Sequence, residues 1–266
     1  MALANRNIKN RIIDSISIIE GVVDGHTLVE AFGYNTGITA TVADISVKGG
    51  VKTYALVTGA TTTTLVSGSA TDQAGTTGAL TARIYGVDLN WDKAQEDITL
   101  AGSSTTVAAV TQFLRVNKVE VLTAGSGAAN VGTLTCAIGS NVECIVKPAL
   151  NQGEICSIHV PRNHIAYITN ISAYSDRVAL QVLDVQLQVR DTGGVFRTVR
   201  DIKVTGNVYQ DCFIPVLHKA DVRLQATLVV AGQVSSTLRY YLVNYGENYT
   251  STAAFVAKGG DYVLTG

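Results

Sequence analysis

The chain has 266 residues, a net charge of -1, and charged side chains at only 15% of its positions. An ordinary soluble domain carries about 25% charged residues, and here small polar residues fill the difference. The balanced charge offers no basic surface for nucleic acid, and no apolar run approaches the roughly 20 residues that cross a membrane. We therefore expect neither nucleic acid nor membrane as a partner. The low-charge surface is suited to close packing between copies of the chain.

The N-terminal 30 residues differ in pattern from the rest of the chain. Ile8, Ile12, Ile16 and Ile19 recur at the spacing of one helix face, although the same stretch also fits a strand. An apolar stripe at a chain terminus usually docks against another surface. We interpret residues 1–30 as an arm whose four isoleucines contact a neighbouring subunit; the competing interpretation is that the arm completes its own sheet. The arm has no features of a secretory signal, so we expect synthesis in the cytoplasm.

From about residue 37 onward, apolar and polar residues alternate with a period of two, which is typical of strands. Turn residues recur at roughly 8–12-residue intervals, as in β-sandwiches and barrels. The clearest expected strands lie at residues 80–86, 97–101, 113–122, 132–138, 142–147, 155–160, 165–173, 180–190, 196–204, 208–214, 222–230 and 238–243. There is room for about sixteen strands, enough for two eight-stranded jelly rolls.

We therefore predict an all-β protein built from two tandem jelly-roll-like β-sandwich domains behind the N-terminal arm. The first domain is expected at residues 31–140 and the second at residues 141–250, with the boundary in the turn near residue 140. Residues 251–266 are expected to form a C-terminal tail. The two halves share no detectable repeat, so a duplicated sequence is not indicated.

The four cysteines, Cys136, Cys144, Cys156 and Cys212, lie inside strand-like runs, without a CxxC pair or a histidine at metal-ligand spacing. In a reducing cytosol, buried cysteines are free thiols by default. We predict four free thiols, no metal site and no cofactor.

Two motifs imitate ligand-binding loops but lack required parts. The loop that begins Gly125-Ser-Gly127 lacks a third glycine, and a strand follows it where a dinucleotide site needs a helix N-terminus. Residues 88–97 open like a calcium loop, but Lys93 and Thr99 occupy the positions that need glycine and glutamate. The same stretch is the densest acidic cluster, so a non-helical ion site or a pair of catalytic carboxylates would use it. Neither motif favours catalysis, and we expect that the protein is not an enzyme.

The main aromatic cluster lies near the C-terminus, at Tyr240, Tyr241, Tyr245 and Tyr249. Tyrosines stack on sugars or anchor protein interfaces. Tyr240 and Tyr241 point to opposite faces of a strand, so at least one of them is expected in the core. A second interpretation of the chain is therefore a module in which Tyr240, Tyr245 and Tyr249 bind a glycan or receptor.

Several segments together resemble a family of virion structural proteins of tailed bacteriophages, of the kind common in marine and cyanobacterial phages. The segments spread over residues 30–245 in the order Phe32-Gly-Tyr-Asn35, Ser67-Gly-Ser-Ala-Thr-Asp72, Gly75-Thr-Thr-Gly78, Ile84-Tyr-Gly-Val-Asp88, Glu96-Asp-Ile-Thr-Leu-Ala-Gly102, Val160-Pro161 and Ala220-Asp-Val-Arg-Leu-Gln-Ala226. Each one is a turn or a strand edge. Their order is therefore more specific than any single segment.

This resemblance implies a non-enzymatic structural subunit of a symmetric phage assembly, such as a head decoration, vertex or minor capsid component. The implied partners are copies of the chain itself, as a homo-oligomer, and other virion proteins, and the implied location is the virion. Two alternatives remain open. One is a tail or fibre module that binds a host receptor or glycan through the tyrosines, and the other is a particle-borne glycosidase.

Overall fold

The computed structural model describes residues 15–48, 50–52, 61–153, 155–176, 181–246, 254–258 and 261–265. Within these ranges, helix is found in α1 (Ser15–Ile19), and the other regular elements are strands in antiparallel pairs. The prediction of an all-β protein is confirmed. The strands form several small antiparallel sheets.

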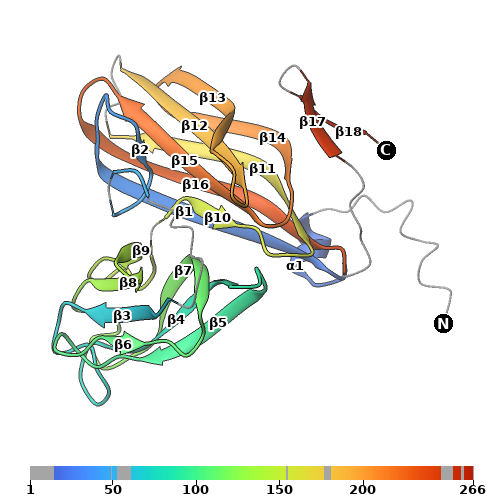
Figure 1. The fold of residues 1–266 in the computed structure, drawn as a ribbon. Coiled ribbons are helices and arrows are strands. Elements are labelled where there is room, and N and C mark those ends of the chain that lie inside the picture. Colours follow the sequence, from blue (N-terminus) through green and yellow to red (C-terminus); the bar gives the residue numbers. More distant parts are fainter. Residues whose placement is uncertain are drawn as a thin grey trace.

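The larger group of strands forms two sheets that face each other. One sheet has the order β1-β16-β11-β14, where these strands are β1 (His26–Ile38), β16 (Gly232–Asn244), β11 (His164–Ser175) and β14 (Val208–Val216). The other has the order β10-β15-β12-β13, with β2 also paired to β15; its strands are β2 (Ala43–Asp44), β10 (Ser157–His159), β12 (Val182–Asp191), β13 (Arg197–Thr205) and β15 (Ala220–Leu228). Figure 1 shows these two layers in the upper part of the molecule.

Buried and more exposed side chains alternate along the strands, and the buried ones form the shared core of this sandwich. In β16, every second side chain from Val234 to Leu242 is buried, while the residues between them are more exposed. Buried residues of both sheets, including Ile168, Leu187 and Leu224, belong to one hydrophobic cluster. Each such side chain contributes about 1.5–3 kcal/mol on burial.

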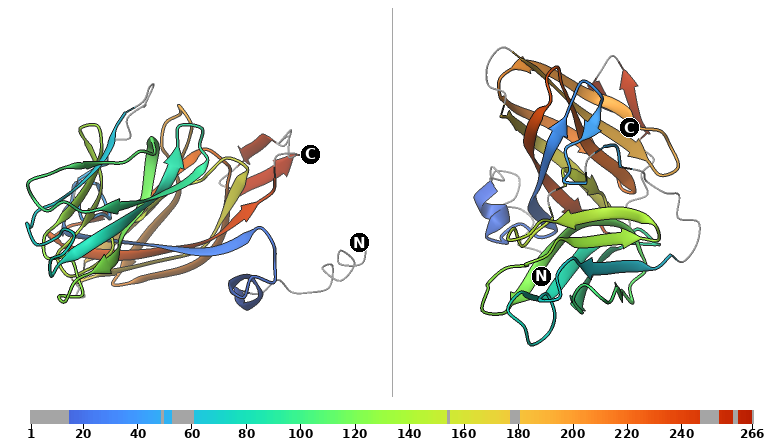
Figure 2. Two further views of the ribbon diagram at one scale, coloured as in Figure 1. Left: turned by 90° about the horizontal axis from the view of Figure 1, so that it is seen from below. Right: turned by 90° about the vertical axis from the view of Figure 1, so that its left-hand side faces the viewer.

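The smaller group also has two sheets around its own core. One sheet has the order β6-β3-β8-β9 and the other β5-β4-β7, with β3 (Thr63–Ser67), β4 (Ala79–Asp88), β5 (Lys93–Thr99), β6 (Val107–Ala108), β7 (Phe113–Ala124), β8 (Leu134–Ile138) and β9 (Asn141–Val146). Phe113, Ile84 and Leu134 are fully buried at its centre. The two views in Figure 2 show this smaller group beside the larger sandwich.

The smaller group is an insertion into the larger sandwich. The chain leaves the sandwich after β2 and returns at β10, and both of these strands pair with β15. β1 pairs with β16 along almost its whole length, so the two ends of the sandwich lie side by side (Figure 1). This arrangement differs from the expected tandem domains at residues 31–140 and 141–250.

The expected boundary near residue 140 falls inside the hairpin between β8 and β9, where Ile138 pairs with Asn141. The structure therefore corrects the boundary. The physical reason is that turn residues locate strand ends but do not specify which strands pair. The expected arm is also shorter than residues 1–30, because β1 begins at His26. The expected C-terminal tail contains the hairpin of β17 (Ala254–Lys258) and β18 (Asp261–Thr265).

The segments at residues 67–78 organise a loop of the smaller group around one buried carboxylate. Asp72 accepts hydrogen bonds from the Ser67 hydroxyl at 2.6 Å and from the backbone N–H groups of Ala79 at 2.8 Å, Val131 at 2.9 Å and Gly132 at 2.8 Å. Burial alone raises the pKa of Asp72, but these four bonds outweigh it and lower the pKa. These motif residues thus hold the loop together.

The segment at residues 32–35 lets β1 approach the strands that flank the insertion. A Cβ atom at Gly33 would lie 2.2 Å from the carbonyl oxygen of Ile45 and 2.5 Å from Cβ of Cys156, so only glycine fits. Two residues later, the buried Asn35 amide donates to the carbonyl of Asp44 at 2.8 Å. This motif is therefore explained by close backbone packing.

Candidate functional site

A buried ionic cluster joins the inserted group to the sandwich. Its centre is Asp221, at the start of β15, which is 1% exposed. Arg115 of β7 places Nε 3.2 Å from Oδ1 of Asp221, and Arg190 of β12 places Nε 3.0 Å from Oδ2. His159, at the end of β10, lies with Nδ1 2.6 Å from Oδ1 of Asp221. Two cations and one imidazole therefore converge on a single carboxylate.

Burial and charge fix the protonation states in this cluster. Burial lowers the pKa of His159 to about 4, against the opposing attraction of Asp221. Burial acts to raise the pKa of Asp221, but His159, Arg115 and Arg190 hold it well below its usual range. At neutral pH the carboxylate is therefore ionised and the imidazole is neutral, so Nδ1 of His159 carries the ring hydrogen and donates a hydrogen bond to Oδ1 of Asp221.

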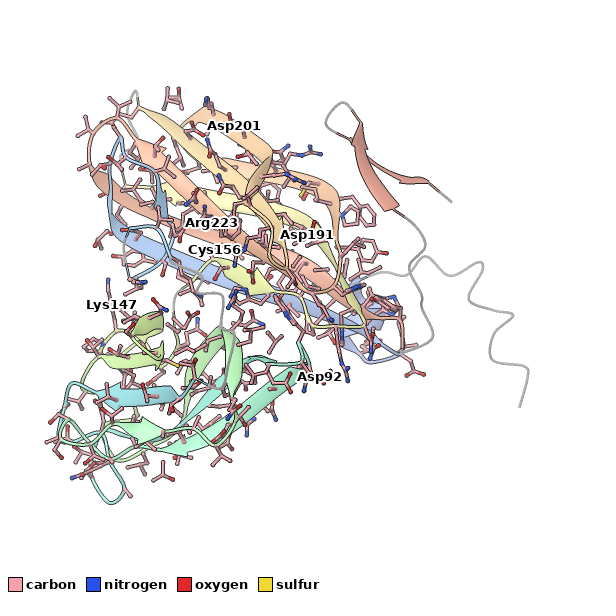
Figure 3. The ribbon with its side chains drawn as sticks, in the orientation of Figure 1. Asp92, Lys147, Cys156, Asp191, Asp201 and Arg223 are labelled. Carbon is pink, nitrogen blue, oxygen red and sulfur yellow. The ribbon has the colours of Figure 1, made fainter. Side chains whose placement is uncertain are left out.

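Further contacts cross the same junction. The Asn117 side chain of β7 accepts from the backbone N–H of His159 at 2.7 Å and donates to its carbonyl at 3.3 Å. Lys52 Nζ lies 2.8 Å from Oε2 of Glu143, and both side chains are buried. Lys147 and Asp92 extend from the inserted group toward the sandwich (Figure 3); Lys147 Nζ lies 4.5 Å from the centre of the Tyr34 ring, and Asp92 pairs with Arg162. The contacts spread along the junction and define how the two groups sit together.

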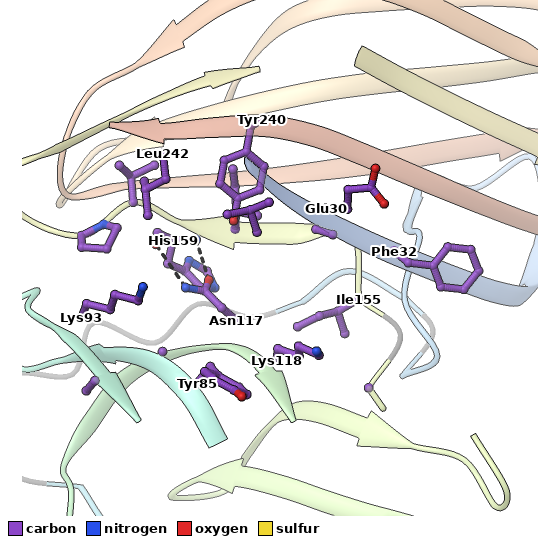
Figure 4. A pocket seen from close by; sticks show the side chains of 18 of the residues that line it. Glu30, Phe32, Tyr85, Lys93, Asn117, Lys118, Ile155, His159, Tyr240 and Leu242 are labelled. Carbon is purple, nitrogen blue, oxygen red and sulfur yellow. Dashed lines mark hydrogen bonds between the residues drawn. The ribbon is translucent and has the colours of Figure 1, made fainter. Parts of the chain in front are cut away.

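A pocket of about 500 Å³ lies in this junction, between β1, β10 and β16 of the sandwich and β4, β5 and β7 of the inserted group. Its walls are mainly apolar and include Val29, Ala31, Ile158 and Leu242. Figure 4 shows the pocket from close by, with Leu242 labelled. Pockets of this size between two structural units are typical ligand sites. We call this space the junction pocket.

Three residues with formal charges, Lys118, Glu30 and Lys93, also line the junction pocket. Lys118 Nζ lies 5.7 Å from the centre of the Tyr85 ring and pairs with Glu120. Glu30 pairs with Arg239, whose Nη2 lies 2.6 Å from Oε1. Lys93 forms no ion pair with any residue in the described part of the chain. The Lys93 amine is therefore the charged group at the pocket that remains available to a ligand.

The structure describes only part of the predicted arm interface. Ile8 and Ile12 lie outside the described residues, and Ile16 is described only as part of the α1 backbone. Ile19 is 67% exposed, whereas its neighbour Ile18 is 5% exposed and packs against the fold. The predicted isoleucine stripe on one helix face is thus interrupted at α1. The role of the arm in assembly stays a prediction.

The structure does not bring the predicted tyrosines into one platform. Tyr240 is 7% exposed and lines the junction pocket. Tyr245 lies beyond the end of β16, and its hydroxyl pairs with Nδ1 of His218. Tyr249 lies outside the described residues. A shared glycan surface formed by these residues is therefore not observed among the residues that are described.

The acidic stretch at residues 88–97 is occupied by protein partners. Asp88 Oδ1 accepts from the backbone N–H groups of Asn90 at 2.8 Å and Asp92 at 2.9 Å. Glu96 accepts from the backbone N–H groups of Val110 at 2.8 Å and Thr111 at 2.6 Å. Asp97 accepts from Nη2 of Arg83 at 2.8 Å. In the described ranges, no group of three or more His, Cys, Asp or Glu side chains is arranged to hold a metal ion.

Exposed aromatic side chains gather on β14, which is an edge strand of its sheet. Tyr209 is 70% exposed and Phe213 is 69% exposed, and Asp211 lies between them on the outward face. The Phe213 ring stacks on Tyr167 of β11, with centroids 5.1 Å apart. Sequence reasoning missed this surface because alternation predicts two faces for a strand but does not say which face is covered.

Sequence reasoning also missed the ionic cluster. Arg115, His159 and Asp221 lie on three different strands, and Arg115 is 106 residues from Asp221. The available signal was a charged residue at an otherwise apolar position of an expected strand, as at Arg115 within residues 113–116. Buried charges are rare unless they are paired.

No family model matches the chain, and no curated protein matches it. Among solved structures, the chain is similar to the structure of the infectious bursal disease virus Gx strain, with 10% identity, a TM-score of 0.27, and coverage of 85% of this chain and 74% of that one. It is also similar to the VP2 subviral particle of the same virus, with 11% identity, a TM-score of 0.24, and coverage of 88% and 78%. Within the described ranges, no helix has the length and hydrophobicity to span a bilayer. TM-scores at this level do not establish a common fold.

Proposed function

We propose that this chain is a non-enzymatic structural subunit of a virus particle, one copy in a symmetric assembly with other copies of itself and with other virion proteins. The head surface of a tailed phage, as a decoration, vertex or minor capsid component, is the place that the sequence resemblance favours. The observation that carries the proposal is the strand order of the sandwich.

The sandwich strands occupy eight positions along the chain when β2 and β10, which both pair with β15, are counted as one position. The two sheets then read 1-8-3-6 and 2-7-4-5. This order supports a jelly roll, which consists of two Greek keys and is common in capsid proteins. The proposal applies this fold to the larger group alone, in place of two tandem jelly rolls.

The exposed aromatic surface supports self-association. Apolar side chains on an edge strand are a liability in a monomer and are usually covered by a partner. Tyr209 and Phe213 on β14 provide such a surface at the far edge of the sheet from β1. The receptor-binding alternative depended on exposed tyrosines, and the burial of Tyr240 does not favour it.

The test is to measure oligomeric state and particle formation of the purified full-length chain by light scattering and electron microscopy. The double variant Tyr209→Ser, Phe213→Ser is expected to keep the melting temperature of the wild type but to lose assembly. Val110→Ser is the matched control, because Val110 is 91% exposed on the inserted group and is not part of the aromatic surface. A wild-type chain that stays monomeric at all concentrations and does not bind virions would contradict the proposal.

A further inference from the structure

The junction pocket contains a tyrosine hydroxyl group that the described residues leave without a hydrogen-bond partner. Tyr240 is 7% exposed, and its hydroxyl forms no hydrogen bond with any residue in the described part of the chain. Figure 4 shows its ring extending from β16 toward the pocket. The hydroxyl is open to the pocket, so a ligand that displaces water from it must supply a hydrogen-bond partner. A hydrogen-bond acceptor inside the pocket would satisfy it.

The charge at the pocket points to an anionic acceptor. Lys93 extends from β5 into the space between the two groups (Figure 4) and has no ion-pair partner among the described residues. The other two lining residues with formal charges, Lys118 and Glu30, already pair with Glu120 and Arg239. The uncompensated charge at the pocket is therefore positive.

The walls determine the rest of the ligand. Val29, Ala31, Ile158 and Leu242 present an apolar surface within a pocket of about 500 Å³. A small inorganic anion would leave this surface wet, whereas an uncharged hydrocarbon would leave the Tyr240 hydroxyl unsatisfied. Only a molecule with an apolar chain and an anionic end matches both features.

We propose that the junction pocket binds an alkyl carboxylate, with its hydrocarbon chain against the apolar walls and its carboxylate between the Tyr240 hydroxyl and the Lys93 amine. The ligand would contact both the sandwich and the inserted group, and would therefore stabilise their junction. This binding site does not depend on the assembly role proposed above.

The test is calorimetric titration of the full-length chain with decanoate below its micelle concentration, with decanol and acetate as separate probes for the chain and the anion. Decanoate is expected to bind one molecule per chain, and decanol and acetate at least tenfold more weakly. Tyr240→Phe and Lys93→Gln should each weaken decanoate binding by about tenfold, because each removes one hydrogen bond or charge from a carboxylate. Ala94→Leu should reduce binding by filling the pocket from β5.

Tyr241→Phe and Lys147→Gln are matched controls, because neither side chain lines the pocket. They should leave the affinity unchanged, and a thermal melt checks that each variant is folded. No saturable binding of decanoate, equal binding of decanol, or an affinity that none of the three pocket variants changes would overturn the proposal.

Discussion

Arg115 of β7 and Asp221 of β15 form a buried ion pair, 3.2 Å between Nε and Oδ1, that connects the inserted group to the sandwich. Their side chains are 5% and 2% exposed. A buried pair contributes little net stability by itself, because desolvation offsets the attraction between the charges. Removal of one partner lowers stability strongly, because it leaves the other charge without compensation in the interior.

Asp221→Asn is therefore expected to lower the free energy of unfolding by about 3–5 kcal/mol, because Arg115 and Arg190 both lose their shared carboxylate. Urea denaturation at pH 7 measures the change. Asp97→Asn is the control: it breaks the exposed pair with Arg83, and exposed pairs contribute little, so the denaturation midpoint should hardly move. Equal effects of the two substitutions would show that the junction cluster is not buried in solution.

Stability should fall with acidification in a window set by His159. Its pKa is about 4 in the folded chain, below the ordinary value of 6.5. Between these values the unfolded chain binds a proton that the folded chain does not, so stability decreases as the pH falls from about 6.5 to about 4. The loss is on the order of 3 kcal/mol. Below the ordinary Asp pKa of 3.8, the unfolded chain also protonates the carboxyl group of Asp221 while the folded chain does not, which lowers stability further.

The measurement is urea denaturation at intervals across this pH window. His159→Gln keeps a donor for Asp221 but does not titrate, so its stability should change less steeply with pH than that of the wild type. Identical slopes for the two proteins would exclude His159 as the titrating group.

The thiols should react in the order of their exposure. Cys136, Cys144 and Cys156 are buried and Cys212 is partly exposed, and all four are free. Burial raises the pKa of Cys144 and of Cys156 to about 12, so their reactive thiolate forms are scarce at pH 8. A thiol reagent should label Cys212 first in the native chain and all four cysteines after denaturation without reductant. Labelling of only two in the denatured chain would indicate a disulfide, and Cys136 and Cys144 are the pair that lies in register on β8 and β9.

Substitutions at the adjacent residues Ile18 and Ile19 test the packing of α1 and its role in assembly separately. Ile18→Ala should destabilise the chain by about 2–4 kcal/mol, because Ile18 is 5% exposed and its removal leaves a cavity. Ile19→Ala should leave the melting temperature unchanged, because Ile19 is 67% exposed, and should weaken self-association if the arm contacts a neighbouring subunit. Thermal melts and light scattering on both variants provide the readout. Normal assembly of Ile19→Ala would remove α1 from the proposed interface.

The candidate site was only partly predictable. The sequence predicts Tyr240 on an exposed platform, whereas the structure places it in the junction pocket beside residues of both groups. For Lys93, the sequence indicates only that a calcium loop is incomplete. No local sequence pattern indicates the pocket or its positive charge, because the pocket forms between strands that are distant in the sequence.

The all-β character of the protein can be predicted from the sequence alone, because the two-residue alternation of a strand is a local property of each segment. It also located most strand ends, since turn residues act locally on the backbone. The folded structure is needed to show that β1 pairs with β16, that the smaller group is inserted between β2 and β10, and that Arg115, His159 and Asp221 converge. These features depend on long-range pairing of strands with similar alternation, and a pattern shared by many strands does not select one partner among them.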